Sequence, residues 1–200
     1  MSKKDKSGES SGHDQNEHAT SHADDHAETH GGQPPAPAAN ELRGTAADDS
    51  LTGTDAAERL RGGDGADTLN GGGGADTLDG GHGADLLTGG AGADVFRIDG
   101  AAKTLAGLDR IADFTHGEDK LVFDDGVAAT DANFATSTAA DYDAALATAN
   151  AKLASGADYV AVQVGTDVIV FAAEHGEHHV DSAVVLVGKS LTDISAGDIA

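Results

Sequence analysis

An acidic residue recurs at every ninth position between residues 44 and 97. Glycines precede the last four of these acids, so the backbone carbonyl groups of tight turns lie close to the carboxylates in the chain. Carboxylate and carbonyl oxygens are the hard ligands that Ca²⁺ takes in sets of six to eight. The spacing therefore predicts several calcium sites in one segment, built around Asp49, Glu58, Asp67, Asp76, Asp85 and Asp94.

These acids belong to a nine-residue unit that has four complete copies, GGDGADTLN (62–70), GGGGADTLD (71–79), GGHGADLLT (80–88) and GGAGADVFR (89–97). Two degenerate copies, GTAADDSLT (44–52) and GTDAAERLR (53–61), precede them in the same register. The eighth place is always a large apolar residue: Leu51, Leu60, Leu69, Leu78, Leu87 and Phe96. A flexible linker has no reason to keep an acid and an apolar residue in phase, so the segment is predicted to be a repeat structure with an apolar interior.

The complete copies fit the pattern G-G-x-G-x-D-x-U-x and resemble the nonapeptide repeat of the RTX family of secreted bacterial proteins. The resemblance implies a parallel β-roll in which two repeats form one coil and each Ca²⁺ lies between repeats n and n+2. The cofactor it implies is calcium alone. The metal-binding residues it implies are Asp49, Gly62, Gly63, Gly65, Asp67, Gly71, Gly72, Gly74, Asp76, Gly80, Gly81, Gly83, Asp85, Gly89, Gly90, Gly92 and Asp94.

The implied sites differ in strength. The best pairs are Asp67 with Asp85 and Asp76 with Asp94. Asp49 should form a weaker site with Asp67, because the first repeat lacks the second and fourth glycines. The pair of Glu58 with Asp76 should form the weakest site, because the Glu58 side chain is one methylene too long for a tight turn, and Glu58 is therefore not among the implied metal-binding residues. Six apolar side chains cannot offset the ordering of about fifty residues, and stacked acids repel one another, so the roll is predicted to fold only with calcium.

The composition limits the possible partners. The net charge of −23 argues against nucleic acid and anionic membranes. The chain has no cysteine, which excludes disulfides and thiolate metal sites. The sequence shows neither an apolar run after Met1 nor a membrane span, so no Sec-type signal peptide is expected. The RTX resemblance instead implies type I secretion through an ABC exporter that reads the C-terminal end, and hence a secreted or cell-surface location.

Residues 1–43 are predicted to form a disordered tail, with a short extended spacer at Pro34–Pro37. Five histidines lie in this tail, and the last four follow one another at intervals of four: His13, His18, His22, His26 and His30. On a helix this spacing would place them on one face, where they could bind Zn²⁺, Ni²⁺ or Cu²⁺. The alternative is a solvated tail whose histidines only titrate.

Residues 98–126 are predicted to cap the open end of the roll. The segment from Asp109 to Phe123 reads as a hairpin around a Thr-His-Gly-Glu turn and is similar to the segment that follows the repeats in serralysin-type domains. Asp109, Asp113 and Asp119 either form one more calcium site or are turn acids, and His116 is expected to be a turn residue. The capping residues are predicted to be Ile111, Phe114, Leu121 and Phe123.

Residues 127–200 are predicted to form a small α+β domain. A helix is expected over 141–155, with Asp141 as N-cap and Gly156 as stop. A β-hairpin is expected over 159–171 with its turn at Gly165–Thr166, followed by a strand over 183–187. This domain resembles the C-terminal target domains of type I secretion substrates. Between its strands lies a polar loop with candidate zinc ligands, which we expect to be an exposed loop instead: Glu174, His175, Glu177, His178 and His179.

The sequence thus predicts a mainly β protein with four parts: a disordered tail (1–43), a calcium-binding β-roll (44–97), a capping segment (98–126) and an α+β secretion-target domain (127–200). No arrangement typical of an enzyme is present, so we expect a binding protein that folds on Ca²⁺ after secretion. The alternative function is transition-metal binding by the histidine-rich tail.

Overall fold

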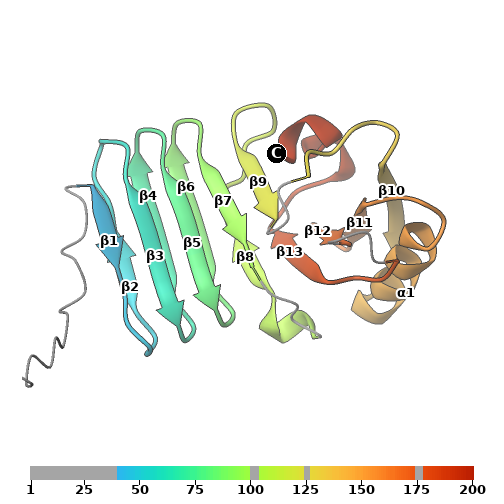
Figure 1. Cartoon of the computed structure of the whole chain (residues 1–200), viewed down its shortest axis with the longest axis horizontal. Coiled ribbons are helices and arrows are strands. Elements are labelled where there is room, and N and C mark those ends of the chain that lie inside the picture. Colours follow the sequence, from blue (N-terminus) through green and yellow to red (C-terminus); the bar gives the residue numbers. More distant parts are fainter. Residues whose placement is uncertain (1–39, 100–103, 124–126, 174–177) are drawn as a thin grey trace, which may run out of the picture. The chain divides into compact units, whose positions relative to one another are not determined.

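The computed structural model describes residues 40–99, 104–123, 127–173 and 178–200. All of them belong to one compact unit, residues 36–200 (Figure 1). The predicted disordered tail, up to residue 39, lies outside the described residues, as do its histidines.

The repeats form strands that alternate between two parallel sheets (Figure 1). The first sheet has the order β1 (Glu41–Arg43), β3 (Arg59–Asp64), β5 (Thr77–His82), β7 (Val95–Ile98) and β9 (Lys120–Phe123). The second contains β2 (Ser50–Thr52), β4 (Thr68–Gly73), β6 (Leu86–Ala91) and β8 (Asp109–Ile111), also parallel. Leu60 pairs with Leu78, and Leu69 pairs with Leu87. Partners are two repeats apart, which confirms the mainly β, parallel roll with two repeats in each coil.

The apolar residues at the eighth place fill the interior of the roll. Leu60, Leu69, Leu78, Leu87 and Phe96 are all completely buried. Strands β3 to β6 each span this residue and continue through the first two glycines of the next repeat.

The segment after the repeats forms a further coil rather than the predicted hairpin. Strand β8 lies beside β6 in the second sheet, whereas β9 lies beside β7 in the first. Ile111 pairs with Leu87 and Leu121 pairs with Phe96, so these two residues occupy the places of repeat leucines. Ile111, Phe114, Leu121 and Phe123 are buried, as a cap requires.

The C-terminal residues extend the second sheet. Strands β10 (Phe134–Ala139), β11 (Tyr159–Val164), β12 (Asp167–Ala172) and β13 (Ser182–Leu186) are joined to the roll where β13 pairs with β8. The predicted hairpin, β11 and β12, is confirmed. Helix α1 (Tyr142–Leu153) is confirmed as well, with the Asp141 carboxylate accepting from the Ala144 N–H. Strand β10 had not been predicted.

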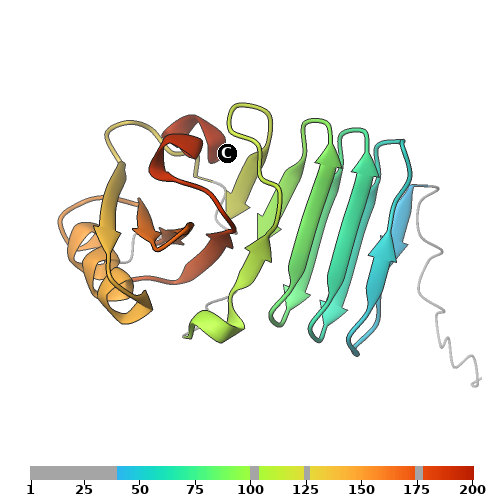
Figure 2. The same ribbon diagram turned by 180° about the vertical axis from the view of Figure 1, so that it is seen from behind.

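Short 3-10 helices complete the described residues: η1 (Leu105–Gly107), η2 (Leu191–Asp193) and η3 (Ala196–Asp198). Seen from behind, η3 and the C-terminus lie beside β9 (Figure 2). Ile199 forms a parallel bridge with Leu121, and the Ala200 N–H donates to the Leu121 carbonyl at 3.0 Å. None of the helices in the described ranges has the length and apolar character of a membrane span.

Candidate metal centre

The repeat acids stack into two columns, one at each turn of the coil. The backbone N–H of each acid donates to Oδ1 of the acid one coil further along, at 2.7–3.0 Å. The first column is Asp49, Asp67, Asp85 and Asp109, and the second is Glu58, Asp76, Asp94 and Asp119.

Both columns therefore extend beyond the repeats, to Asp109 and Asp119. These two acids are 5% and 3% exposed. The nine-residue period does not predict these positions, because Asp109 follows Asp85 by 24 residues and Asp119 follows Asp94 by 25, whereas the repeat acids of one column are 18 residues apart. A local signal was present: each stands two residues before a buried apolar residue, as Asp67 stands before Leu69.

The complete and the degenerate repeats differ in the hydrogen bonding of the second carboxylate oxygen. In the described part of the chain, four aspartates are only 1% exposed, and their Oδ2 atoms have no hydrogen-bond partner: Asp67, Asp76, Asp85 and Asp94. A buried carboxylate oxygen without a donor is unfavourable, and a bound cation is one way to satisfy it.

In the two degenerate repeats a threonine satisfies the acid instead. The Thr45 N–H and hydroxyl donate to Oδ2 of Asp49 at 2.6 and 2.8 Å. The Thr54 N–H donates to Glu58 at 3.1 Å, and its hydroxyl donates to the same carboxylate. Threonine replaces the second glycine of the complete repeat at both places, so these acids have less need of a metal.

The glycines leave room for the oxygens to converge. A methyl group on Gly62 would overlap Oδ2 of Asp67 and the carbonyl oxygen of Gly80 at once. Gly71 has the same relation to Asp76 and Gly89. A carboxylate from one repeat and a carbonyl from the repeat two further on thus approach the same space, which only glycine leaves open. The glycines at the second and fourth places of the complete repeats all have positive φ, which allows the backbone to turn tightly.

This donor set fits Ca²⁺, which accepts carboxylate and backbone carbonyl oxygens together. No group of three acidic or histidine side chains that could hold a metal occurs among the described residues. The two observations agree, because sites of this kind draw part of their ligands from the backbone rather than from clustered side chains.

Burial raises the pKa of five of the stacked acids. It raises the pKa of Asp85 to about 6 and that of Asp109 to about 7, and the negative charges of neighbouring acids add to the effect. Hydrogen bonds from the backbone oppose the increase without cancelling it. The pKa values of Asp76, Asp94 and Asp119 are also raised, mainly by burial. The columns therefore hold carboxylates that favour neutralisation, by a proton or by a cation.

Asp113 has a different role from the two column acids near it. Its Oδ1 accepts from the Gly89 N–H at 3.0 Å and its Oδ2 from the Gly90 N–H at 2.8 Å. Both of its oxygens thus bind the backbone of the last complete repeat. Asp113 caps the roll, whereas Asp109 and Asp119 continue the stacks.

The histidines of the described residues lie apart from these columns. His82 is exposed at the end of β5. His116 does more than form a turn, since its Nδ1 lies 2.6 Å from the buried Asp198 carboxylate. His179 pairs with Asp181 at 3.1 Å. The other candidate zinc ligands of that loop, Glu174, His175 and Glu177, lie outside the described residues.

Comparison with known proteins agrees with this geometry. The family model for the RTX calcium-binding nonapeptide repeat (4 copies) matches residues 37–69 and 61–96. The chain is similar to the solution structure of the AlgE6R3 subunit of the Azotobacter vinelandii mannuronan C5-epimerase. The identity is 30% and the TM-score 0.54, over 78% of this chain and 80% of that chain.

The AlgE6R2 subunit of the same organism's enzyme is also similar, with 32% identity and a TM-score of 0.52. The match covers 79% of this chain and 90% of that chain. No curated protein matches the sequence.

Proposed function

We propose that this chain, which belongs to the family of RTX calcium-binding nonapeptide repeat proteins, acts outside the cell and folds its β-roll by binding Ca²⁺ after type I secretion. The observation that carries this proposal is the row of buried, unpartnered Oδ2 atoms of Asp67, Asp76, Asp85 and Asp94. At Gly62 and Gly71, Oδ2 of Asp67 and of Asp76 approaches the same space as the carbonyl oxygens of Gly80 and Gly89.

Calcium would supply positive charge between stacked carboxylates and would join one coil to the next. The complete repeats would hold it through their aspartates and the glycine-turn carbonyls. Asp49, already hydrogen-bonded to Thr45, would contribute to a weaker site. Asp109 and Asp119 would add the last carboxylate to each column, beyond the ligands expected from the repeats alone.

The same chemistry supports secretion before folding. Calcium sites of extracellular modules have dissociation constants of about 10⁻⁴–10⁻³ M, far above the level that fills cytosolic sensors. The acid columns would repel one another inside the cell, and the chain would remain unfolded and able to pass an exporter. RTX proteins are typically secreted, which agrees with this order of events.

We assign the chain a binding role rather than a catalytic one. Six of the seven buried acids among the described residues are spread along two columns that run the length of the roll, instead of converging on one cleft. This arrangement supports a surface, matrix or ion-binding role.

Circular dichroism tests the proposal. The spectrum in EGTA should show a largely unfolded roll, and adding millimolar calcium should produce β structure. Magnesium at the same concentration is the control and should have little effect, because it requires closer octahedral coordination. Identical spectra in EGTA and in calcium would contradict the proposal.

A further inference from the structure

A glycine follows the ninth place of every repeat except the last, and the metal centre explains why. A methyl group on Gly71 would overlap Oδ2 of Asp76 and the carbonyl oxygen of Gly89. The ninth place itself varies, and the residues that precede these glycines are Thr52, Arg61, Asn70, Asp79 and Thr88. The glycine that the calcium site requires therefore creates an Asn-Gly sequence at Asn70.

An asparagine before a glycine can react with its own main chain, because glycine has no side chain to hinder its amide nitrogen. The Gly71 nitrogen bonds to Cγ of Asn70 and loses its proton, the Cγ–Nδ2 bond breaks, and ammonia leaves. Water then opens the five-membered imide. Cleavage between Cγ and the nitrogen leaves aspartate. Cleavage at the main-chain carbonyl leaves isoaspartate, in which the chain runs through the former side chain.

The folded roll opposes this reaction. Strand β4 lies between β2 and β6, where Asn70 pairs with Thr52 and with Thr88. The Asn70 backbone carbonyl accepts from the Gly53 N–H at 2.8 Å. Parallel strands have ψ of about +115°, whereas ring closure requires the Gly71 nitrogen to turn towards the Asn70 side chain. Cyclisation therefore needs β4 to leave the sheet, so it is a reaction of the opened chain.

Within the described residues, only the strand restrains Asn70. Its side chain is exposed and makes no hydrogen bond to them. The other three described asparagines each donate through Nδ2: Asn40 to the Ala57 carbonyl at 2.9 Å, Asn133 to Asp158 at 2.8 Å and Asn150 to the Leu146 carbonyl at 3.0 Å. None of these three precedes a glycine. Asn70 is therefore the described asparagine whose reaction depends on whether the roll is folded.

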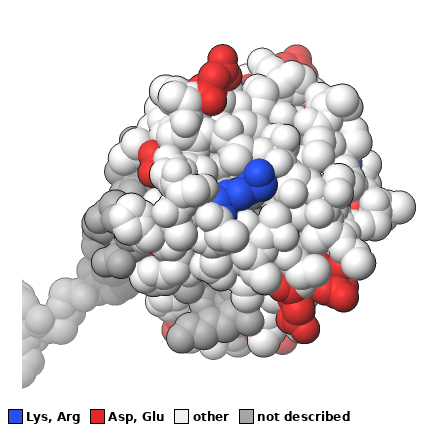
Figure 3. Space-filling model, turned by 90° about the vertical axis from the view of Figure 1, so that its right-hand side faces the viewer, with Lys and Arg blue, Asp and Glu red and all other residues white. Residues whose placement is uncertain are grey.

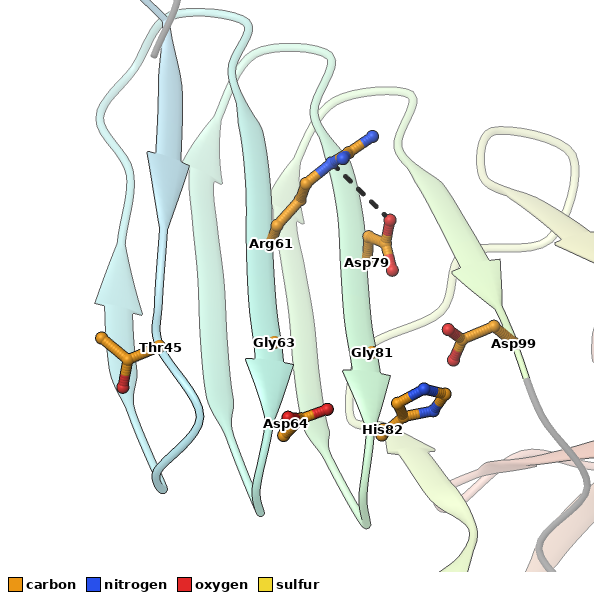
Figure 4. Close-up of a pocket in the computed structure, with 8 residues that line it drawn as sticks. All are labelled: Thr45, Arg61, Gly63, Asp64, Asp79, Gly81, His82 and Asp99. Carbon is orange, nitrogen blue, oxygen red and sulfur yellow. Dashed lines mark ion pairs between the residues drawn. The ribbon is translucent and has the colours of Figure 1, made fainter. Parts of the chain in front are cut away.

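Asp79, at the same place of the next repeat, is less reactive than Asn70. It lies 3.8 Å from Nε of Arg61 and 3.8 Å from Nε of Arg97, and Figure 4 shows the pair with Arg61. These arginines favour the ionised carboxylate. An ionised carboxylate resists attack by a backbone nitrogen because it already carries negative charge, whereas the amide of Asn70 is neutral.

We propose that Asn70 is a modification site controlled by calcium: the calcium-free chain converts it to isoaspartate, and the calcium-bound roll prevents the conversion. Isoaspartate adds one carbon atom to the main chain between Leu69 and Gly71. Because inward and outward side chains alternate along a strand, the residues that follow can no longer keep their register with β6 while Leu69 stays buried. A chain kept too long without calcium thereby loses the ability to fold, irreversibly.

Peptide mass mapping after incubation at neutral pH tests the proposal. The full chain is kept in millimolar calcium, in EGTA, or in EGTA with urea. Trypsin cleaves after Arg61 and Arg97 and releases residues 62–97, in which Asn70 is the only side-chain amide. The mass gain of this peptide therefore reports Asn70 alone. It should be fast in EGTA and in urea, and at least about tenfold slower in calcium, where β4 rarely opens.

Two asparagines of the same chain are internal controls. Asn133 and Asn150 share the tryptic peptide 121–152 and precede Phe134 and Ala151. Asn150 lies on α1, at an end of the molecule that is largely uncharged (Figure 3), so clustered acids do not oppose loss of the amide proton there. This peptide should gain little mass even in urea, because neither asparagine precedes a glycine.

The variant Asn70→Thr tests the consequence for folding, since threonine already holds the ninth place at Thr52 and Thr88. After incubation in EGTA and return to calcium, the wild-type protein should recover less β structure by circular dichroism, in proportion to its isoaspartate content. The variant should recover fully. Equal losses in the two proteins would contradict the proposed effect of isoaspartate.

Two other results would overturn the proposal: no mass gain of peptide 62–97 in urea, or equal gain in calcium and in EGTA when only the calcium sample is folded. The inference rests on the proposed function, because calcium protects Asn70 only by folding the roll. Circular dichroism of each sample separates the two failures. A roll that stays folded in EGTA contradicts control by calcium, whereas mass gain in urea still identifies Asn70 as the residue that reacts.

Discussion

The aspartates of the complete repeats use their two oxygens for different purposes. Oδ1 accepts a backbone N–H from the preceding coil and fixes the side chain, for example at 2.7 Å between the Asp67 N–H and Asp85. Oδ2 is buried without a donor, as described for all four complete repeats. Asp49 differs, because Thr45 donates twice to its Oδ2. At the scale of single residues, the need for a metal therefore depends on whether the second place of the repeat is glycine or threonine.

Replacing Asp85 by asparagine should separate these roles. Asparagine can still accept the Asp67 N–H but loses the charge, so calcium affinity should fall roughly tenfold or more, as for other changes at metal sites. Asp49→Asn is the matched control and should weaken binding by less than about threefold, since its carboxylate is already satisfied by the protein. Isothermal titration calorimetry measures both variants. Equal losses would show that the threonine bonds do not distinguish the sites.

The raised pKa values of Asp85 and Asp109 predict opposite effects of pH with and without calcium. Their values, about 6 and about 7, exceed the ordinary carboxyl value near 4. The folded roll thus binds protons that the unfolded chain releases, and protonation stabilises the calcium-free fold. This stabilisation is complete below about pH 4 and is lost as the pH rises through about 6 to 7. In EGTA, lowering the pH from about 7.5 to 5 should therefore increase the folded fraction.

When calcium is present, lowering the pH should have the opposite effect. The metal requires ionised carboxylates, so its apparent affinity should decrease over the same pH interval. Circular dichroism in EGTA and calorimetry in calcium measure the two effects. Asp109→Asn is the control variant and should make both profiles less steep, with the remaining change attributable to Asp85. Profiles that stay flat in the wild-type protein would show that these acids do not titrate in this range.

At the scale of elements, the coils stack because glycine lets neighbouring turns touch. Gly81 has φ +89°, and a methyl group there would overlap the carbonyl oxygen of Gly63. Gly188 also has positive φ, +67°, but nothing lies within 4 Å of the position of a methyl group. Substitution at Gly188 would introduce backbone strain alone, whereas substitution at Gly81 would introduce backbone strain and a steric clash between coils.

Gly188→Ala should cost about 1–2 kcal/mol of unfolding free energy, the strain of a left-handed residue with a side chain. Gly81→Ala adds the clash with Gly63 and should cost clearly more, roughly 3 kcal/mol or above. Urea unfolding in millimolar calcium measures the difference. Similar losses in the two variants would mean that the coils are not packed as closely as described.

The structure of the repeat block could be predicted well because the nine-residue period of its sequence determines its fold. An apolar residue in phase with glycines determines both the inward face and the two-repeat coil, as the pairing of Leu60 with Leu78 shows. The segment from Asp109 to Phe123 was misread because its two apolar runs around a Gly turn also fit a hairpin. Only the packing of Ile111 on Leu87 and of Leu121 on Phe96 reveals a coil. The extension of the acid columns followed from that coil and was missed with it.

At the scale of the whole molecule, the C-terminus closes the end of the roll. Asp198 accepts from the Gly117 N–H at 2.9 Å, from His116 at 2.6 Å and from the Ser195 N–H at 2.8 Å. Burial would raise the pKa of Asp198, but these hydrogen bonds lower it below its ordinary value. The last residues of the chain thus hold the turn that leads to Asp119, the final acid of one column.

Replacing Asp198 by alanine should destabilise this junction by roughly 2–3 kcal/mol, because it removes a buried carboxylate that accepts several hydrogen bonds. Asp193→Ala is the matched control, since Asp193 caps the neighbouring 3-10 helix in the same way, through Ser190, but is less buried than Asp198. It should lower the melting temperature much less. Thermal unfolding in calcium distinguishes the two variants, and an equal decrease would contradict a closing role for the C-terminus.

Calcium is the link between these scales, because it neutralises the acids, joins the coils and thereby provides the surface on which the C-terminal residues pack. Hydrogen–deuterium exchange across residues 62–97 tests this most directly. The account predicts slow amide exchange throughout this segment in millimolar calcium and rapid exchange in EGTA. Exchange that is equally rapid in both buffers, or equally slow in both, would contradict it.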